Sequence, residues 1–363
     1  MQLKQRINAF IALGNFLKQL VSENPNFNNH LLTAEKQKEF FETAKNKLAA
    51  AEIGNSWFTQ DNIQFSLESW AEALTEENLL QWVSVYESLK TSSEVSKNNT
   101  KTIAIIMAGN IPLVGFHDFL CCLITGNKVL AKLSSNDKVL LPFLSEYLIA
   151  IEPGFKEYIS FTEEKLENFD AIIATGSNNT SRFFEYYFSK YPHIIRKNRN
   201  SVAVLTGGES TEQLHGLADD IFRYFGLGCR NVSKIYVPND YDFDKFFNAI
   251  FSWKEIINNN KYINNYDYNK AVYLMDSNNL LDNEFLLLKE DEGFSSPIAV
   301  LFFGKYSSLS EMESLITEQT KNIQCVVSNS GLPNEIAFGQ AQHPKLWDYA
   351  DGVDTVNFLL KLQ

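Results

Sequence analysis

Between Lys101 and Leu205 the sequence alternates short apolar, β-branched runs with longer segments of helical periodicity, and this alternation restricts the fold more than any other feature. The segments between the runs predict helices at 116–125, 138–151 and 181–188, whereas the runs themselves predict five strands, at 103–107, 128–133, 158–162, 170–174 and 201–205. Strands and helices that alternate at this spacing form a parallel sheet covered by helices. Such a sheet binds its ligands beyond the carboxyl ends of its strands, so we expect binding residues in AGNIP, KLSSND, ATGSNNTS and LTGGES.

One of these segments has the pattern of a phosphate site. Thr175, Gly176 and Ser177 lie where a predicted strand ends and a helix begins, and the N–H groups and dipole of a helix N-terminus favour an anion. Glycine and serine are equally ordinary turn and N-cap residues, so this segment alone does not identify a phosphate site. The GxGxxG fingerprint is absent from the sequence. A nicotinamide cofactor would therefore be held in another way.

Cys229 is the side chain best suited to covalent chemistry. It lies between a predicted helix at 211–224 and a predicted strand at 234–237, with Gly228 before it and Arg230 after it. A structural cysteine usually acts as a small hydrophobe inside an apolar run, and nothing around Cys229 requires one. The sequence therefore predicts a nucleophilic thiol, whose thiolate fraction Arg230 or flanking backbone N–H groups would raise.

The other cysteines have the pattern of packing residues. Cys121 and Cys122 are adjacent in the apolar run FLCCLITG, and Cys325 lies in the strand-like IQCVV. No CxxC pair is present and the five histidines are scattered, so we expect no metal site. An acidic tail segment, DYADGVD, lacks EF-hand spacing and is read as a solvated turn.

Composition narrows the classes of partner. The chain has 363 residues, 45% of them hydrophobic, which is typical of a soluble globular protein with room for two domains. Its net charge of −12 repels phosphate backbones and anionic lipid headgroups, so we expect neither nucleic acid nor a membrane as partner. The first twenty residues predict an amphipathic helix without a signal-peptide cleavage site. We therefore expect a cytoplasmic protein with no membrane insertion.

Residues 1–97 are helical in pattern and poor in strand signals. Helical periodicity extends over 32–54 and 66–90, with Thr75 as a predicted cap of a second helix in the latter range. Aromatic side chains recur here, and we interpret them as the stripe by which the helices dock on a core rather than as a binding face; they are Trp57, Phe58, Phe65, Trp70 and Trp82. The polar segment SSEVSKNN marks a boundary near residue 97.

The second half of the chain continues the mixed pattern. Residues 239–282 are rich in aromatics and asparagine and are expected to form helices with loops. A helix is predicted at 309–319, and further strands are predicted at 285–288, 297–303 and 323–328. The sequence thus predicts a second α/β region after the cysteine.

The motifs taken together, in order, resemble the aldehyde dehydrogenase superfamily, and within it the acyl-CoA reductases of the bacterial bioluminescence type. MAGNIPLVGFHDFL resembles the segment with the oxyanion-binding asparagine, here Asn110, and GNKVLAKLSSND the segment whose lysine holds the adenosine ribose, here Lys132. ATGSNNTSRFF resembles the pyrophosphate turn, here Gly176 and Ser177, and GLGCRNVSKIYVP the nucleophile loop of Cys229. The resemblance covers roughly residues 100–363.

Departures from the wider superfamily bear on the reaction. Dehydrogenases that oxidise aldehydes carry a water-activating glutamate two residues before the double glycine that begins at Gly207, and this chain has Leu205 there. The nearby carboxylate of Glu209 is displaced from that motif. Ser135 replaces the glutamate that takes both ribose hydroxyls, which permits a 2′-phosphate and so favours NADP(H), with NAD(H) as the alternative. Glu292 is the candidate for the late glutamate that contacts the nicotinamide ribose, although the register of the segment differs by one residue.

The resemblance implies an α/β fold of the aldehyde dehydrogenase type. We expect an N-terminal helical region at 1–97 packing on the cofactor domain and a nucleotide-binding, Rossmann-type domain at 98–205. A catalytic thiol domain is expected at 206–330, and a C-terminal segment returning to the cofactor domain at 331–363. The usual oligomerisation hairpin is not found before residue 101, which leaves homo-oligomerisation open.

The resemblance also implies NADPH-dependent reduction of an acyl-CoA or acyl-carrier thioester to the aldehyde. Cys229 would carry the acyl group, and Asn110 with the Cys229 backbone N–H would hold the oxyanion. His117 is a candidate proton donor, although a histidine satisfied by helix packing is the preferred interpretation. One alternative is an oxidative NAD(P)-dependent aldehyde dehydrogenase, against which Leu205 argues. A second is a non-catalytic member that only binds nucleotide.

Overall fold

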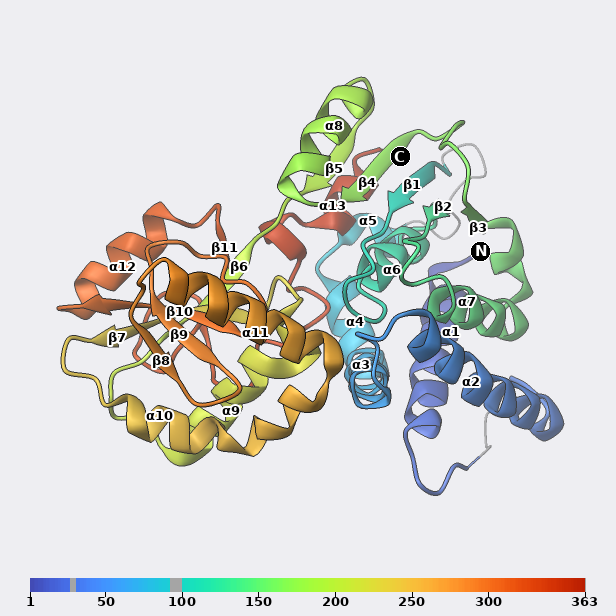
Figure 1. Cartoon of the computed structure of the whole chain (residues 1–363). Helices are drawn as coiled ribbons and strands as arrows, with labels where there is room; N and C mark the ends of the chain where they lie inside the picture. The colour runs from blue at the N-terminus through green and yellow to red at the C-terminus, as the bar shows by residue number, and fades with distance from the viewer. Residues whose placement is uncertain (27–30, 92–99, 363) are drawn as a thin grey trace. The chain divides into compact units, whose positions relative to one another are not determined.

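The computed structural model describes residues 1–26, 31–91 and 100–362. They form two compact units (Figure 1): the first combines Met1–Lys197 with Lys345–Gln363, and the second is Asn198–Pro344. Each unit is built around its own sheet. The boundary that the sequence predicts near residue 97 falls on 92–99, outside the described residues.

The sheet of the first unit has five parallel strands in the order β3-β2-β1-β4-β5. The strands are β1 (Thr102–Ile106), β2 (Lys128–Lys132), β3 (Ile159–Thr162), β4 (Ala171–Thr175) and β5 (His193–Arg196). This is the strand order of a Rossmann-type sheet, in which the order reverses between β1 and β4. The predicted fold class is confirmed.

One strand of the prediction belongs elsewhere. The sequence assigns 201–205 to this sheet as its fifth strand, and this is wrong: β6 (Asn200–Val204) pairs with strands of the second unit, and β5 takes the fifth place. The strand β5 is only four residues long, with two apolar residues between His193 and Arg196. Two adjacent apolar residues between polar ones give no alternating or continuous signal, whereas the longer apolar run at 201–205 predicts a strand.

Both faces of this sheet are covered. Alternate residues of β1, such as Ile103 and Ile105, pack into the core shared with the N-terminal helices, α6 (Phe116–Ile124) and α7 (Leu140–Ile151). The intervening residue Ala104 faces the other way, toward a cluster that includes Phe184 of α8 (Asn178–Phe188). Burial on both faces explains why these strands read as continuous apolar runs.

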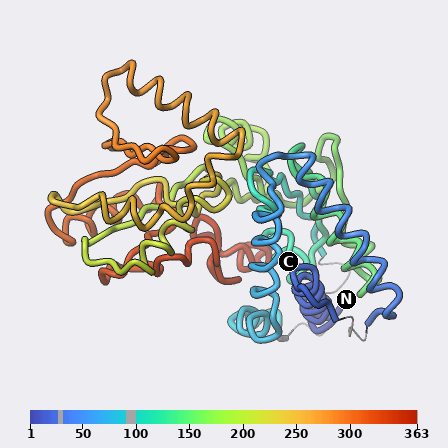
Figure 2. Tube along the Cα trace, turned by 60° about the horizontal axis from the view of Figure 1, so that its bottom comes forward, coloured from blue at the N-terminus to red at the C-terminus, as the bar shows by residue number. Residues whose placement is uncertain are grey.

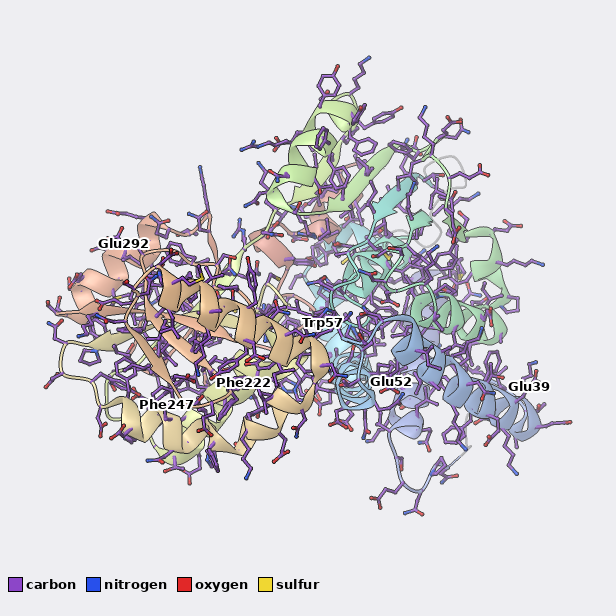
Figure 3. All side chains as sticks on the ribbon, in the orientation of Figure 1. Glu39, Glu52, Trp57, Phe222, Phe247 and Glu292 are labelled. Atoms are coloured by element: carbon purple, nitrogen blue, oxygen red, sulfur yellow. The ribbon has the colours of Figure 1, made fainter. Side chains whose placement is uncertain are left out.

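In the described part of residues 1–101, five helices precede the sheet: α1 (Leu3–Leu20), α2 (Ala34–Gly54), α3 (Gln60–Ala73), α4 (Glu76–Ser84) and α5 (Glu87–Thr91). Phe58 and Trp82 are fully buried in the core, and Trp57, labelled in Figure 3, packs against it together with Trp70. Thr75 caps α4 by accepting the Asn78 N–H at 3.3 Å. The prediction of this cap is confirmed, and so is that of the docking stripe for Trp57, Phe58, Trp70 and Trp82.

The C-terminal segment of the first unit is fastened by a buried ion pair. Arg196, at the end of β5, lies 2.7 Å from Asp118 of α6, and it also donates to the Ala350 carbonyl and to the Thr355 hydroxyl. Thr355 begins α13 (Thr355–Leu360), which follows the short turn η4 (Ala350–Gly352). The Arg196 and Thr355 contacts hold the Asp118 carboxyl below its ordinary pKa in spite of its burial. One arginine thus joins β5, α6 and the end of the chain.

The second unit contains a seven-stranded sheet in the order β12-β11-β6-β7-β10-β9-β8. All neighbouring strands are parallel except the pair β8 and β9 at one edge. The strands other than β6 are β7 (Val232–Pro238), β8 (Leu280–Asp282), β9 (Leu287–Glu290), β10 (Val300–Tyr306), β11 (Ile323–Val327) and β12 (Glu335–Ile336). The short strands β8 and β12 were not predicted.

Four α-helices accompany this sheet: α9 (Thr211–Phe222), α10 (Phe243–Ile250), α11 (Asn260–Met275) and α12 (Leu309–Glu318). Figure 2 shows the trace leaving α11 and returning through the adjoining strands β8 and β9, in orange. An ion pair of 2.6 Å between Lys270 and Asp282 ties α11 to β8. The expectation of helices with loops is confirmed for 239–279, and it is wrong for 280–282, which form β8. None of the helices in the described ranges is long and apolar enough to cross a membrane.

Candidate functional site

Cys229 lies on an exposed loop between α9 and β7. The chain reaches it through a tight turn, η2 (Arg223–Gly226), in which Tyr224, Phe225 and Gly226 all have left-handed backbone angles, with φ of 55°, 58° and 76°. Glycine adopts this conformation readily, whereas two bulky aromatics in it are strained and need support from their surroundings. Both aromatic side chains are buried, which supplies that support.

Side-chain hydrogen bonds fix this loop from two sides. The Asn231 amide donates to three carbonyls at the end of α9, the closest being that of Arg223 at 2.7 Å, and its oxygen accepts the Gly228 N–H at 2.8 Å. On the other side, the buried Ser201 hydroxyl of β6 donates to the Cys229 carbonyl at 3.0 Å. Asn231 and Ser201 therefore hold the backbone around the thiol, a role that the sequence did not predict for either residue.

A third contact comes from the segment 339–341. Asp220 of α9 is fully buried and accepts the N–H groups of Gly339 and Ala341 at 2.7 and 2.9 Å. Arg230, next to the cysteine, donates to the Ala341 carbonyl. Burial raises the pKa of Asp220 to about 7. The arginine expected to act on the thiol thus also anchors this segment.

The other cysteines differ among themselves. Cys121 and Cys122 are fully buried in α6, and burial raises the pKa of both thiols, so the prediction of packing residues is confirmed for them. Cys325 is only half-buried, contrary to expectation. Its sulfur lies 2.8 Å from the Ser201 oxygen, which connects it to the hydrogen bond on Cys229.

The turn that follows β6 is closed by its own carboxylate. Glu209 is buried, and its two oxygens accept the N–H of Thr206 and that of Gly207, the latter at 3.0 Å. Gly207 has a φ of 87°, which a residue with a Cβ rarely adopts. Leu205, at the position of the missing glutamate, is fully buried, and its carbonyl accepts the Tyr306 hydroxyl. Glu209 therefore caps the turn, and Leu205 is a core residue.

Glu292 lies in the loop between β9 and β10 and is exposed (Figure 3). Its neighbour Asp291 organises this loop by accepting the Gly293 N–H at 2.8 Å and by an ion pair with Lys289. Lys234 of β7 donates to the Asp291 carbonyl at 2.7 Å. Glu292 is thus available to a ligand, and a contact with the nicotinamide ribose stays a prediction.

Asn110 lies in the loop between β1 and α6 of the first unit. The N-terminal helices hold this loop: the Ser66 hydroxyl of α3 donates to the Pro112 carbonyl at 3.1 Å, and Asn55 donates to the Gly109 carbonyl at 3.5 Å. Sequence reasoning missed both contacts, because they join residues about fifty positions apart. The N-terminal helical region therefore also supports the loop that carries Asn110.

A buried carboxylate completes the support of that loop. Asp137 accepts the Leu113 N–H at 3.1 Å, and Leu113 has a left-handed φ of 58°. Burial raises the pKa of Asp137 to about 6. An aspartate after a strand could have been read as a helix cap, but its partner lies 24 positions away on a different loop.

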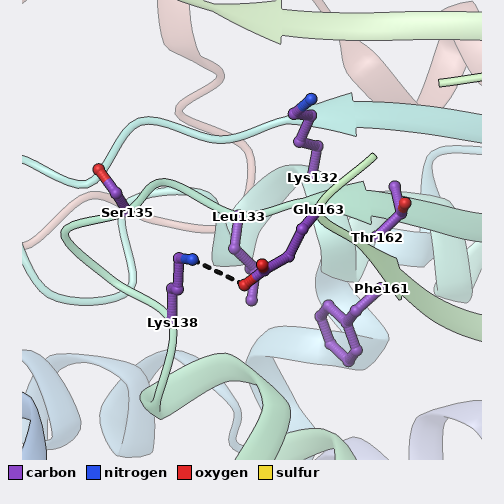
Figure 4. A pocket seen from close by; sticks show the side chains of 7 residues that line it. All are labelled: Lys132, Leu133, Ser135, Lys138, Phe161, Thr162 and Glu163. Carbon is purple, nitrogen blue, oxygen red and sulfur yellow. Dashed lines mark hydrogen bonds and ion pairs between the residues drawn. The ribbon is translucent and has the colours of Figure 1, made fainter. Parts of the chain in front are cut away.

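Lys132 and Ser135 line one pocket of about 430 Å³ beyond the carboxyl ends of β2 and β3 (Figure 4). The other residues around it are Leu133, Lys138, Phe161, Thr162 and Glu163. Lys132 donates to the carbonyl of Glu164 at 2.9 Å. The sequence analysis missed Lys138 and Glu163, which form an ion pair of 2.6 Å here.

Gly176 and Ser177 lie at the carboxyl end of β4, where α8 begins. The Ser177 hydroxyl caps the helix by accepting the Thr180 N–H at 3.2 Å. A Cβ at Gly176 would lie 2.9 Å from a ring atom of Phe184, so only glycine fits without movement. No acidic side chain occupies the first turn of α8, which keeps that end attractive to an anion.

His117 is a packing residue. Its Nε2 lies 2.9 Å from the Leu346 carbonyl oxygen, and its ring is surrounded by Trp70, Trp82 and Tyr349. Burial lowers its pKa, so the imidazole is neutral near pH 7. The preferred interpretation from the sequence therefore fits, and His117 is a poor candidate for a proton donor.

The first unit thus brings together the expected ribose residues, and the second places the nucleophile, the Gly207 turn and Glu292 around a sheet of its own.

Solved structures of aldehyde dehydrogenases have the same fold. An indole-3-acetaldehyde dehydrogenase with NAD+ aligns with a TM-score of 0.62 over 93% of this chain and 75% of its own, at 11% identity. Aldehyde dehydrogenase 21 from Physcomitrella patens, with the product succinate, gives 0.61 over 98% and 87%, at 13% identity. An NAD+ complex from Mycobacterium tuberculosis gives 0.56 over 92% and 76%, at 11% identity.

The chain therefore has the aldehyde dehydrogenase fold. The family model for acyl-CoA reductase (LuxC) matches residues 3–252, and the protein belongs to that family. No curated protein matches it in sequence. Family and fold together make it an oxidoreductase that acts on aldehydes or acyl groups.

Proposed function

We propose that this protein reduces an acyl thioester, carried by CoA or by an acyl carrier, to the aldehyde through an acyl intermediate on Cys229. The observation that carries the proposal is a contrast within the second unit. Cys229 is exposed on a loop fixed by Asn231 and Ser201, whereas Leu205, at the position of the water-activating base, is fully buried in the core. A thioester on Cys229 would lack the glutamate that drives hydrolysis, so reduction can compete.

We propose NADPH as the cofactor, with NADH as the alternative. Two of the dehydrogenases with this fold hold NAD+, which supports a nicotinamide here. Lys132 and Ser135 would contact the adenosine ribose, and Gly176 with Ser177 the pyrophosphate; Gly207 and Glu292 are further expected contacts. The donors present suit such a molecule, because the pocket offers ammonium and hydroxyl groups and the start of α8 carries no competing carboxylate. When bound, the reduced nicotinamide supplies the hydride.

The residues of the chain then perform the acyl transfer. The Cys229 thiolate adds to the thioester carbonyl carbon, and the C–O π electrons move to the oxygen. Collapse of this tetrahedral adduct expels the carrier thiolate and leaves an acyl thioester on Cys229. After hydride addition to that carbonyl carbon, the alkoxide oxygen re-forms the C=O bond as the C–S bond breaks, which releases the aldehyde and returns the Cys229 thiolate.

Oxyanion stabilisation is proposed for the Asn110 side-chain amide and the Cys229 backbone N–H. The support for Asn110 is its loop, which Ser66 and Asp137 hold at two points. Preorganised donors are worth more than flexible ones, because they need no rearrangement as the charge develops.

The test is a reduction assay with purified protein. Acyl-CoAs of increasing chain length are mixed with NADPH or NADH, and cofactor oxidation, free CoA and aldehyde are each quantified. We expect the three to appear in equal amounts. CoA release without aldehyde would indicate a thioesterase, and oxidation of added aldehyde without CoA would indicate an ordinary dehydrogenase; either result would overturn the proposal.

A further inference from the structure

The pocket that holds Lys132 and Ser135 carries an ion pair with no role in the function proposed above. Lys138 Nζ lies 2.6 Å from Glu163 Oε1, and Figure 4 shows the two side chains meeting across the pocket, one from the segment before α7 and one from the segment after β3. The lysine side chain is 45% exposed and the carboxylate 80% exposed. The pair is therefore in water, where such contacts are weak and exchange readily.

The charges of the pocket are unequal. Two ammonium groups, those of Lys132 and Lys138, line it, against the single carboxylate of Glu163. Lys132 donates to a main-chain oxygen, the Glu164 carbonyl, so the carboxylate of Glu163 does not neutralise its charge. The hydrogen bond and the positive charge of the Lys138 ammonium group lower the pKa of the Glu163 carboxyl, which is therefore ionised near pH 7. The side chains that line the pocket thus carry a net positive charge, and their one negative group is the exposed carboxylate of Glu163.

This arrangement responds differently to the two forms of a nucleotide ribose. A 2′-phosphate carries nearly two negative charges and strong acceptor oxygens, so it competes with Glu163 for Lys138 and is repelled by Glu163 itself. A 2′-hydroxyl has no charge to compete with, and a carboxylate can accept its hydrogen bond. In the sequence, Ser135 in place of a glutamate favours NADPH, because no carboxylate there would repel a 2′-phosphate. Glu163, which follows β3, brings a carboxylate to the same pocket and so weakens that preference in part.

We propose that the Lys138–Glu163 pair sets the discrimination between a 2′-phosphate and a 2′-hydroxyl on the adenosine ribose. Lys138 favours the phosphate, Glu163 opposes it, and the excess of ammonium groups leaves the phosphate preferred. The inference rests on the proposed nicotinamide function of this pocket, but it concerns the choice between two cofactors rather than the reaction.

Direct binding of two fragments tests it without catalysis. Isothermal titration calorimetry measures 2′,5′-ADP and 5′-AMP on the wild type and on Glu163→Gln, Lys138→Met and Glu167→Gln. Glu167 is the matched control, because it is an exposed partner of Lys165 in the same connection between β3 and β4 and does not line the pocket.

We expect Glu163→Gln to raise the preference for 2′,5′-ADP by roughly three- to tenfold and Lys138→Met to lower it by a similar factor, as for exposed charge contacts. Glu167→Gln should leave the preference unchanged. If both fragments bind and neither pocket variant changes their ratio, the selector role is wrong and the proposed function stands. If neither fragment binds the wild type at millimolar concentration, the nucleotide site fails and the selector with it.

Discussion

Asp220 gives the second unit a dependence on pH whose sign and size follow from its surroundings. Its ordinary pKa is 3.8, and burial raises the pKa to about 7, with Asp219 adding to the rise and the N–H groups of Gly339 and Ala341 and the charge of Arg230 opposing it. A carboxyl that holds its proton more tightly when folded stabilises the folded state fully below pH 3.8, and this contribution is lost as pH rises through 7. Between pH 6 and pH 8 the loss is about 1.4 kcal/mol.

Replacing the carboxyl by an amide removes this titration. We expect the free energy of unfolding of the wild type, relative to Asp220→Asn, to fall by about 1.4 kcal/mol between pH 6 and pH 8. Urea unfolding followed by circular dichroism measures it, at pH values above the sequence pI of about 5.0, where the net charge keeps the protein dispersed.

The control is Asp219→Asn, which makes the same chemical change one residue earlier, at a carboxylate that is 51% exposed. Asp219 adds only part of the rise in the Asp220 pKa, so the difference between Asp219→Asn and the wild type should vary less with pH than that of Asp220→Asn. A constant difference between the wild type and Asp220→Asn at both pH values, or one that moves the other way, would refute a raised pKa at Asp220.

Two further variants probe the supports of each unit. Arg196→Met leaves the buried Asp118 carboxylate without its ion-pair partner, and we expect a loss of about 3–5 kcal/mol in thermal or urea unfolding. Lys197→Met, which removes an exposed ion pair next to it, should not measurably change the melting temperature. Asn231→Ala removes four hydrogen bonds at the Cys229 loop, so kcat should fall at least tenfold while the affinity for 2′,5′-ADP, measured by calorimetry, is unchanged. Weakened fragment binding would show that the variant has a wider structural defect.

The sequence predicted most of the first sheet because its strands are buried on both faces. Runs such as 103–107 and 170–174 are continuous and apolar, and the helices between them keep a clear period. The strands β8 and β12 were not predicted because three and two residues carry too little pattern, and β5 was not predicted because its two adjacent apolar residues lie between His193 and Arg196. The assignment of 201–205 to the wrong sheet followed from the loss of β5.

The sequence picks out candidate site residues by motif, but it does not predict the residues that support them. Asn110, Lys132 and Cys229 lie in short segments with a recognisable order of residue types. Ser66 and Asp220 act through backbone atoms that are far away in sequence, at Pro112 and at 339–341, and single residues give no sign of such partners.

The electrostatics of the pocket around Lys132 and Ser135 show the same limit. The substitution at Ser135 was visible because it breaks a family pattern. Glu163 supplies a carboxylate to that pocket from the end of another strand, and only the pairing of β2 with β3 brings the two together.

The most direct test of Cys229 as the acyl carrier is mass spectrometry of the protein after incubation with an acyl-CoA in the absence of nicotinamide. Trypsin releases the cysteine in the peptide 224–230, between Arg223 and Arg230. We predict that this peptide gains the mass of the acyl group, that added NADPH removes it with release of aldehyde, and that Cys229→Ala abolishes both. An acyl group on Cys325 or another residue, or aldehyde formation by Cys229→Ala, would contradict the proposed mechanism.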